Sequence, residues 1–437
     1  MATARHPSRR PRPGVRAAVL ALVPGLAILL GAGSPAAALA PATPTPGTLP
    51  PPPACATAVS MASGTVTSPP SPLPVPTSTL GGERLSSPGV QVDVTAGVAG
   101  PPALRATAWL VADLDAGTVV ASCNAHVRMA PASTLKILTS LALVHRLNWS
   151  ARYVGQPQDA ATDGTRVGIV PGSSYTVSDL FHGLMLASGN DAATALSTVA
   201  GGMPATTALM NARARELGAD DTTAVNDSGL DAPGQLTSAY DLALLGRAAL
   251  ADPLLTGLIR TRTYMFPGKG DRPPRPSFQI QNHNELLFQY PGATGVKNGY
   301  TTTAGGSYVG SATRNGHSYL VTVLRAEGFT WHVAKDLLDW AFTAAPRATP
   351  VGRLVAPGEV AAAGATDPGP DGTGSPTGTA TAPAGATRAA ASSGSGTDDT
   401  RTGWIVLVTL GVVLLGGATT AGGRARRGRS RTSARRR

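Results

Sequence analysis

The stretch Pro131-Ala-Ser-Thr-Leu-Lys136 decides how this chain is interpreted, because it opens an apolar helical pattern over residues 134–146. Ser133 falls in the first turn of the predicted helix, and a spacing of three residues places the Lys136 amine on the same face as the Ser133 hydroxyl. A serine becomes a strong nucleophile when a base takes its proton, and a lysine whose pKa is lowered by burial or by a helix N-terminus can be that base. The chain has only four lysines, so a chance match is rare, but a surface lysine that follows a serine by three residues is the alternative.

Two further short motifs contain residues suited to a reaction site. Ser188-Gly-Asn190 lies between helical patterns at 177–186 and 192–200, where a short loop can direct a hydroxyl and an amide into a cleft. Lys297-Asn-Gly299 stands at the start of a predicted strand, where a lysine would attract a substrate carboxylate and Gly299 would permit close backbone approach. Taken singly, each motif is also explained as an ordinary turn, with a solvated lysine in the second case.

The order of the predicted elements indicates the fold class. Strand patterns at 106–113 and 118–122 flank an Asp-Ala-Gly turn, and patterns at 306–313 and 318–325 flank an Asn-Gly turn, so a hairpin is predicted near each end of the body. The helical patterns cover residues 134–146, 177–186, 192–200, 204–217, 238–251 and 330–342. Strands at both ends with helices between them predict an α+β or mixed α/β fold, in which an antiparallel sheet carries a helical insert.

The two ends of the chain have the composition of targeting segments. Residues 1–40 combine arginines, a short apolar run and small residues, which is typical of a cleaved secretory signal peptide, with an uncleaved anchor as the alternative. Residues 403–423 carry no charge and predict a transmembrane helix, and the arginine-rich tail 424–437 marks the cytoplasmic side. The body is therefore expected on the outer face of the cell membrane, held by a single pass.

Composition also separates one folded domain from its linkers. Residues 41–89 are rich in Pro, Thr and Ser, and residues 351–402 in Gly, Ala, Thr and Pro, so we expect a disordered linker and a stalk around a domain at 90–350. The net charge of +11 rests on 13 arginines in residues 1–16 and 424–437, and without them it falls to −2. A body without basic excess argues against nucleic acid as a partner.

The cysteine and histidine content limits the covalent and metal chemistry. Cys55 and Cys123 are candidates for a disulfide in an exported chain, and this bond would join the N-terminal linker to the body, although two free thiols are equally open. No cysteine and histidine cluster has the spacing of metal ligands, so we expect neither a metal ion nor another cofactor.

In this order, the three motifs resemble the S-x-x-K, S-x-N and K-T-G signatures of the penicillin-binding and serine β-lactamase superfamily. The chain is most similar to the low-molecular-weight penicillin-binding D-alanyl-D-alanine carboxypeptidases (peptidase S11), especially the actinobacterial, membrane-anchored type. Further stretches that resemble this family are 182–191, 227–231, 237–241 and 282–287. The resemblance implies an antiparallel five-stranded sheet flanked by helices, with a helical subdomain.

The resemblance also implies a mechanism. Ser133 would be the acyl-ester nucleophile and Lys136 its general base, while Ser188, hydrogen-bonded to Lys136, would relay the proton to the leaving D-alanine. Backbone N–H groups of Ser133 and Tyr300 would form the oxyanion hole. The substrates would be peptidoglycan stem peptides, and β-lactam antibiotics would be covalent inhibitors.

The remaining site residues implied by the resemblance bind substrate, and one of them departs from the family pattern. Asn190 would orient the peptide or the base, and Lys297, Asn298 and Gly299 would hold the substrate's terminal carboxylate. The family has Thr or Ser where this chain has Asn298, and losing a transition-state contact there would cost one or two orders of magnitude in rate, at about 1.4 kcal/mol per tenfold.

Two alternatives follow from these residues. A catalytically weak or inactive module that binds peptidoglycan at the membrane would be marked by Asn298. A β-lactamase is less favoured, because neither Glu216 nor Glu285 stands in the Glu-x-x-x-Asn pattern that supplies a deacylating glutamate.

Overall fold

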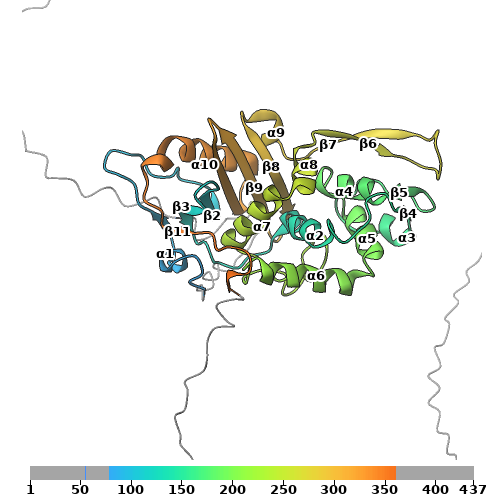
Figure 1. Ribbon diagram of the computed structural model, residues 1–437, viewed down its shortest axis with the longest axis horizontal. Coiled ribbons are helices and arrows are strands. Elements are labelled where there is room, and N and C mark those ends of the chain that lie inside the picture. The colour runs from blue at the N-terminus through green and yellow to red at the C-terminus, as the bar shows by residue number, and fades with distance from the viewer. Residues whose placement is uncertain (1–54, 56–77, 361–437) are drawn as a thin grey trace, which may run out of the picture. The chain divides into compact units, whose positions relative to one another are not determined.

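The computed structural model describes Cys55 and residues 78–360 (Figure 1). The predicted signal peptide at 1–40, the transmembrane segment at 403–423 and the tail at 424–437 lie outside the described residues, as do most of the linker and stalk. Within residues 78–360, no single helix is both long enough and apolar enough to cross a membrane.

A seven-stranded sheet, antiparallel at every pairing, forms the centre of the body. Its order is β1–β3–β2–β10–β9–β8, with β11 beside β3. The strands are β1 (Val90–Val92), β2 (Ala106–Asp113), β3 (Thr118–Cys123), β8 (Ala293–Thr301), β9 (Gly305–Arg314), β10 (His317–Ala326) and β11 (Gly352–Arg353). Both predicted hairpins, β2–β3 and β9–β10, are confirmed, but the expected count of five strands omits the short β1 and β11.

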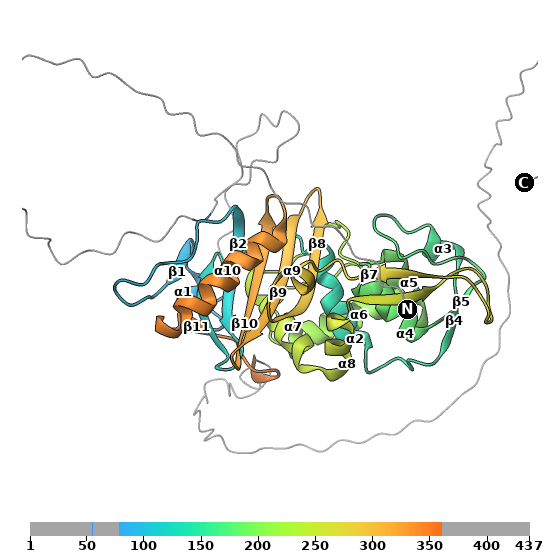
Figure 2. The same ribbon diagram turned by 90° about the horizontal axis from the view of Figure 1, so that it is seen from above.

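Helices cover both faces of this sheet. One face contacts α10 (Thr330–Ala344), which runs across β9 and β10 (Figure 2), and the other contacts α7 (Ala239–Ala251). On β10, Leu320 and Leu324 therefore belong to one apolar core, and the alternating Val321 and Val323 belong to a second core under α10. A strand covered on both faces is apolar at successive positions, as β10 is.

The predicted helical insert forms the second part of the body, beside the edge strand β8 (Figure 1). Its main helices are α2 (Lys136–Leu143), α4 (Val177–Met185), α5 (Asn190–Val199) and α6 (Met203–Glu216). Helix α4 begins where the Thr176 hydroxyl accepts the Asp179 amide at 3.0 Å, while the Asp179 carboxylate accepts the Thr176 amide at 2.7 Å. This reciprocal cap satisfies two helix-terminal donors and explains why the helix starts there.

Several elements were not predicted. They are α1 (Glu83–Ser86), β4 (Arg152–Val154), α3 (Pro157–Ala160), β5 (Ser174–Thr176), α8 (Pro253–Arg260), β6 (Thr263–Pro267), β7 (Ser277–Gln281), α9 (Leu286–Gln289) and the 3₁₀ turns η1 (Ala132–Leu135) and η2 (Ala345–Arg347). The β6–β7 hairpin is joined by a loop rich in Gly and Pro, which conceals any periodic pattern.

The folded body is longer than the predicted 90–350. Leu85 of α1 is fully buried although it lies in the predicted linker, and Val351, Leu354 and Val355 are buried although they lie in the predicted stalk. Both boundaries differ from the prediction for the same reason. A few apolar residues at the end of a polar, Pro-rich or Gly-rich segment are enough to pack that end against a core.

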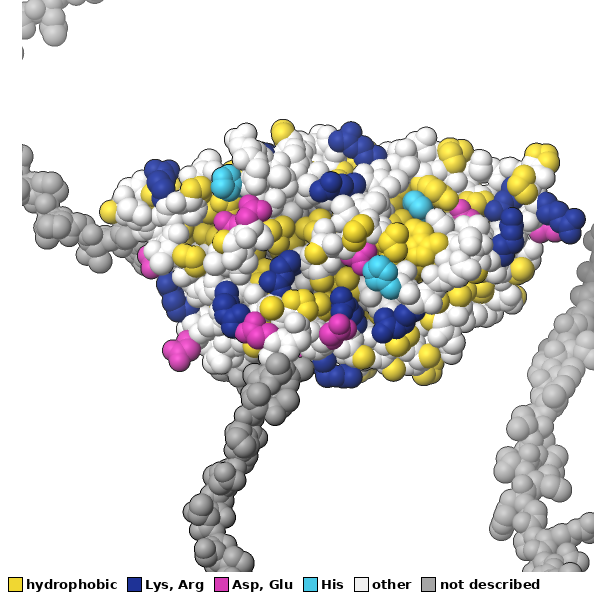
Figure 3. Space-filling model, viewed as in Figure 1, with side chains coloured by type: hydrophobic (Ala, Val, Ile, Leu, Met, Phe, Trp, Pro, Cys, Tyr) yellow, Lys and Arg dark blue, Asp and Glu magenta, His cyan; other side chains and the backbone are white. Residues whose placement is uncertain are grey.

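Charged side chains are dispersed on the surface. On the face shown in Figure 3, Lys and Arg side chains are scattered among uncharged and acidic ones and do not gather into a stripe. This face provides no path for a phosphate backbone.

A disulfide joins Cys55 to Cys123, the last residue of β3, with the two Cα atoms 6.2 Å apart. The bond closes a loop between two residues with a sequence separation of 68, and it lowers the conformational entropy of the unfolded chain.

Reduction of this disulfide should therefore lower the free energy of unfolding by about 4 kcal/mol. Urea titration with and without reductant measures this loss, and a Cys55→Ser/Cys123→Ser chain should not respond to the reductant. Equal urea midpoints for the oxidised and reduced parent would contradict the prediction.

Candidate active site

The side chains of Ser133 and Lys136 meet where the turn η1 passes into α2. The Lys136 Nζ lies 2.9 Å from Ser133 Oγ, so the spacing of three does place both groups on one face. The same Nζ donates to Asn190 Oδ1 at 2.7 Å and to the Ser228 carbonyl at 2.5 Å. An amide oxygen and a carbonyl can only accept, so a neutral Lys136 amine would give its two hydrogens to them and leave its lone pair facing the Ser133 hydroxyl.

The surroundings of Lys136 favour this neutral form. Its side chain is fully buried, and burial holds the pKa of Lys136 well below its usual range, with the nearby charge of Lys297 acting in the same direction. The carboxyl groups of Asp227 and Asp191 raise the Lys136 pKa but have smaller effects. The site therefore contains a lysine suited to accept a proton.

Ser188 lies in the loop between α4 and α5, as predicted, and holds a left-handed backbone with φ of 57°. This backbone conformation is energetically unfavourable for a residue other than glycine, and residues in such conformations are frequent at functional sites. The expected hydrogen bond from Ser188 to Lys136 is absent from the hydrogen bonds of residues 78–360. Ser133, Asn190 and the Ser228 carbonyl are instead the partners of the Lys136 amine.

Asn190 fits an orienting role. It is the first residue of α5, and its Nδ2 donates to the Asp163 carbonyl at 2.7 Å while its Oδ1 accepts from Lys136. Because both ends of the amide are occupied, the Asn190 side chain is held in one orientation and fixes the amine in turn.

The third motif lies within β8 and not at the start of a strand. The strand begins at Ala293, four residues before Lys297, and Gly292 and Gly295 conceal this beginning in the sequence. Lys297 is 1% exposed, and burial lowers its pKa to about 7. Its Nζ donates to the Asn298 carbonyl at 2.8 Å and to Asn298 Oδ1 at 3.2 Å, so the Asn298 side chain keeps its N–H groups for another partner.

Gly299 brings β8 against the nucleophile. A Cβ at this position would lie 2.6 Å from the Ser133 amide nitrogen and 3.0 Å from that of Thr134, closer than real Cβ atoms come. The expected close backbone approach is therefore present. Asn298 and Tyr300, on either side of Gly299, line a hollow of about 230 Å³ with His283, Glu285, Tyr308, Phe329, Thr330 and Trp331.

Some residues at the site were missed from the sequence. The Ser228 carbonyl binds Lys136, and the neighbouring Asp227 is buried, accepts the Ser197 hydroxyl at 2.5 Å and has its pKa raised by burial. Ser307 on β9 donates its hydroxyl to the Pro131 carbonyl at 2.7 Å, which fixes the turn before the nucleophile. The resemblance of stretch 227–231 to a family was the only signal for the first two. No group of three or more His, Cys, Asp or Glu side chains in the described ranges could hold a metal ion.

The chain is similar to known D-alanyl-D-alanine carboxypeptidases. The family model for D-alanyl-D-alanine carboxypeptidase, peptidase S11, matches residues 95–328. The carboxypeptidase DacB2 of Mycobacterium tuberculosis is 40% identical over 256 residues, which cover 57% of this chain and 86% of that protein. DacC of Escherichia coli is 32% identical over 266 residues, which cover 57% of this chain and 64% of that protein.

Similar solved structures include enzymes of the same kind. A crystal structure of D-alanyl-D-alanine carboxypeptidase from M. tuberculosis is 38% identical with a TM-score of 0.57, and the match covers 60% of this chain and 100% of that one. The Streptomyces K15 DD-transpeptidase is 25% identical with a TM-score of 0.54, and the match covers 56% and 99%. With a family model that spans more than half its length, and with the Ser133 and Lys136 geometry in place, the chain belongs to the peptidase S11 family of D-alanyl-D-alanine carboxypeptidases.

Proposed function

We propose that the chain removes the terminal D-alanine from peptidoglycan stem peptides through an acyl-enzyme on Ser133. Its activity as a serine-type D-Ala-D-Ala carboxypeptidase follows from its family and relatives. The observation that carries the residue assignment is the buried Lys136 amine, 2.9 Å from Ser133 Oγ, with acceptors at its other two positions.

In the first half-reaction, Ser133 Oγ attacks the carbonyl between the last two D-alanines while Lys136 takes its proton. Negative charge develops on the carbonyl oxygen, and the backbone N–H groups of Ser133 and Tyr300 stabilise it. The lack of a Cβ at Gly299 supports this assignment, because it lets β8 lie against the Ser133 amide.

Collapse of this intermediate requires a proton on the leaving amine. Lys136 holds the proton that it took from Ser133, and Ser188, 6% exposed in the loop before α5, is the proposed relay. In the tetrahedral intermediate, the Ser133 oxygen is bonded to the substrate carbon and no longer shares a proton with the amine, which frees one N–H of Lys136 for Ser188. Ser188 then takes that proton as it gives its own hydroxyl proton to the leaving nitrogen, and the C–N bond breaks. Water then hydrolyses the ester and releases the shortened peptide.

The terminal carboxylate of the substrate is assigned to Lys297 and Asn298. Lys297 supplies positive charge, and the Asn298 N–H groups can donate because its Oδ1 is engaged by Lys297. The same carboxylate position would be used by the carboxylate of a β-lactam, which acylates Ser133 in place of the peptide.

Asn298 can be tested directly. Asn298→Ala removes the donor and should lower kcat/KM for D-alanine release roughly tenfold to a hundredfold, at about 1.4 kcal/mol per tenfold. Asn298→Thr supplies a hydroxyl donor and should stay within about tenfold of the parent. A parent that is inactive, but is activated by Asn298→Thr, would show instead that asparagine has suppressed catalysis.

The activity assay uses the full chain in detergent and measures D-alanine released from diacetyl-Lys-D-Ala-D-Ala. Loss of release in Ser133→Ala is the expected result, and release that persists would overturn the mechanism.

We further propose that residues 403–423 anchor the chain in the cell membrane with the body outside. The uncharged segment and the arginine-rich tail after it support this topology. Residues 1–402, expressed in a host that exports them, should be recovered outside the membrane fraction, while the full chain should remain in it.

A further inference from the structure

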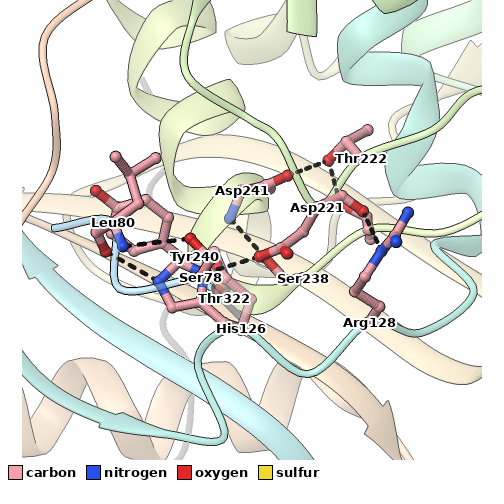
Figure 4. Close-up of polar contacts among 12 residues, drawn as sticks. Ser78, Leu80, His126, Arg128, Asp221, Thr222, Ser238, Tyr240, Asp241 and Thr322 are labelled. Atoms are coloured by element: carbon pink, nitrogen blue, oxygen red, sulfur yellow. Dashed lines mark hydrogen bonds and ion pairs between the residues drawn. The ribbon is translucent and has the colours of Figure 1, made fainter. Parts of the chain in front are cut away.

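A buried polar cluster surrounds His126 and connects it to Asp221 and Tyr240 (Figure 4). We define this His126 cluster as His126, Asp221, Thr222, Tyr240 and Asp241. His126 is 1% exposed and follows β3, in the segment that joins this strand to η1. The mechanism proposed above uses no member of this cluster.

Both ring nitrogens of His126 are engaged. Nδ1 lies 2.7 Å from Asp221 Oδ2, and Nε2 lies 2.9 Å from the Leu80 carbonyl. The carbonyl can only accept, so Nε2 carries a hydrogen, and the contact with a carboxylate oxygen requires another proton between Nδ1 and Asp221. Whether the pair is charged or neutral, the imidazole is locked in one orientation.

A second buried carboxyl group, that of Asp241, lies near Asp221. Asp241 is 1% exposed, and burial, followed by the charge of Asp221, raises its pKa well above the usual range. The Thr222 hydroxyl donates to Asp241 Oδ2 at 2.6 Å. The two carboxyl groups therefore have different partners. Asp221 contacts the His126 ring, and Asp241 accepts the Thr222 hydroxyl.

The loop between His126 and Ser133 is pinned at several points. The Arg128 Nε donates to the Asp221 carbonyl at 3.1 Å, and the Met129 and Thr237 backbones exchange two hydrogen bonds of 2.8 Å. Immediately before Ser133, Ala132 has a φ of 49°. A strained alanine persists only where its surroundings fix it, and these contacts hold the segment that leads to Ala132.

The cluster also touches the two places where the body meets the rest of the chain. The Tyr240 ring packs on His126 with centroids 4.6 Å apart, and its hydroxyl donates to the Arg353 carbonyl at 3.0 Å and accepts the Val355 amide at 3.1 Å. The Arg353 amide donates to the Gly81 carbonyl at 2.9 Å. The segments beside Leu80 and Val355 are thus bonded to each other and to the cluster.

We propose that His126 is a positioning residue for acylation, and that its pair with Asp221 holds the loop so that Ser133 stays between Lys136 and Gly299. This inference rests on the proposed role of Ser133 as nucleophile. Small displacements matter here, because a shift of about 1 Å in a reacting group can cost roughly a hundredfold in rate.

Two amide substitutions separate the two hydrogen bonds of His126. The Nδ2 of His126→Asn takes the place of the ring Nδ1 and can donate to Asp221, whereas the Nε2 of His126→Gln takes the place of the ring Nε2 and can donate only to Leu80. We expect His126→Gln to acylate with a fluorescent penicillin about tenfold to a hundredfold more slowly than the parent, and His126→Asn to stay within about threefold. The rate is taken per molecule that finally becomes acylated, counted by intact mass, so that unfolded protein does not contribute.

A second pair of variants tests the partner. Asp221→Asn can still hydrogen-bond the imidazole and should retain the parent rate, whereas Asp221→Leu should slow acylation as much as His126→Gln does. In the slow variants, kcat for D-alanine release should fall while KM changes little, because the binding residues on β8 are untouched.

Parent rates in both His126→Gln and Asp221→Leu, with lower thermal stability only, would overturn the proposal and leave the cluster a purely structural role. Equal losses in His126→Asn and His126→Gln would also overturn it, because the bond to Asp221 would then not be the one that matters. Failure of the nucleophile assignment is separately visible, since labelling would then survive in Ser133→Ala.

Discussion

Replacing Ser133 with alanine is expected to abolish labelling by a fluorescent penicillin and to lower D-alanine release by about 10⁴-fold or more. The Ser133 hydroxyl lies 2.9 Å from the Lys136 amine, and the acyl-enzyme cannot form without it. The fold should survive, because the substitution removes one oxygen from a turn whose backbone is held by Ser307 and by the contact with Gly299.

The matched control for this loss is Ser277→Ala. Ser277 is exposed on β7, in a two-stranded hairpin separate from the sheet that contains Lys297, and its replacement should leave labelling and release at parent levels. The measurements are labelling on a gel, intact mass after penicillin treatment, and D-alanine release. A penicilloyl adduct of unchanged stoichiometry on the Ser133→Ala chain would mean that another residue is the nucleophile.

Lys136→Arg has the second largest expected effect, a loss of roughly 10²–10⁴-fold in the acylation rate constant, the usual contribution of a general base. Arginine can still donate to Asn190 and the Ser228 carbonyl, but it does not lose its proton in proteins. The substitution therefore removes basicity while it keeps the hydrogen-bond donors, and it places a permanent positive charge where the resting lysine is neutral. Lys335→Arg, on α10 beside Asp339, is the surface control and should be silent.

The pH dependence of acylation gives the same assignment an independent test. Acylation requires Lys136 without its extra proton, so the rate should rise with pH as Lys136 is deprotonated and fall below that range. Because burial and Lys297 hold the pKa of Lys136 well below its usual range, this rise should come far below the pH at which an ordinary lysine titrates. A rising limb located where exposed lysines titrate would contradict a neutral Lys136 in the resting site.

The parts of the fold with a strong local signal were predictable. The β2–β3 and β9–β10 hairpins have turn residues between alternating strands, and α4 has a Thr176 and Asp179 cap before an apolar face. The start of β8 was missed because two glycines break its pattern, and β1 and β11 are too short to show a period at all.

In the site, too, some features were predictable from the sequence and others were not. The spacing of Ser133 and Lys136 survives folding because both lie on consecutive turns of one segment. The Ser228 carbonyl is a backbone group, which any residue could provide, so the residue type at this position does not indicate its role. The His126 and Asp221 pair joins residues on separate loops, and the three partners of the Lys136 amine come from three different segments, which only the tertiary structure reveals.

The pairing of β2 with β10 determines when this body can complete its folding during synthesis. Val111 pairs with Val321, so the first long strand stays without its central neighbour until almost the whole body has left the ribosome. Contacts between such distant residues close slowly, and chains dominated by them fold slowly. The helices between the two hairpins can form earlier, but the contact of β8 with η1 at the site cannot, because β8 also comes late in the chain. Ser133 is thus synthesised long before β8, the strand that completes its site. A chain that still lacks β8 therefore has no competent active site.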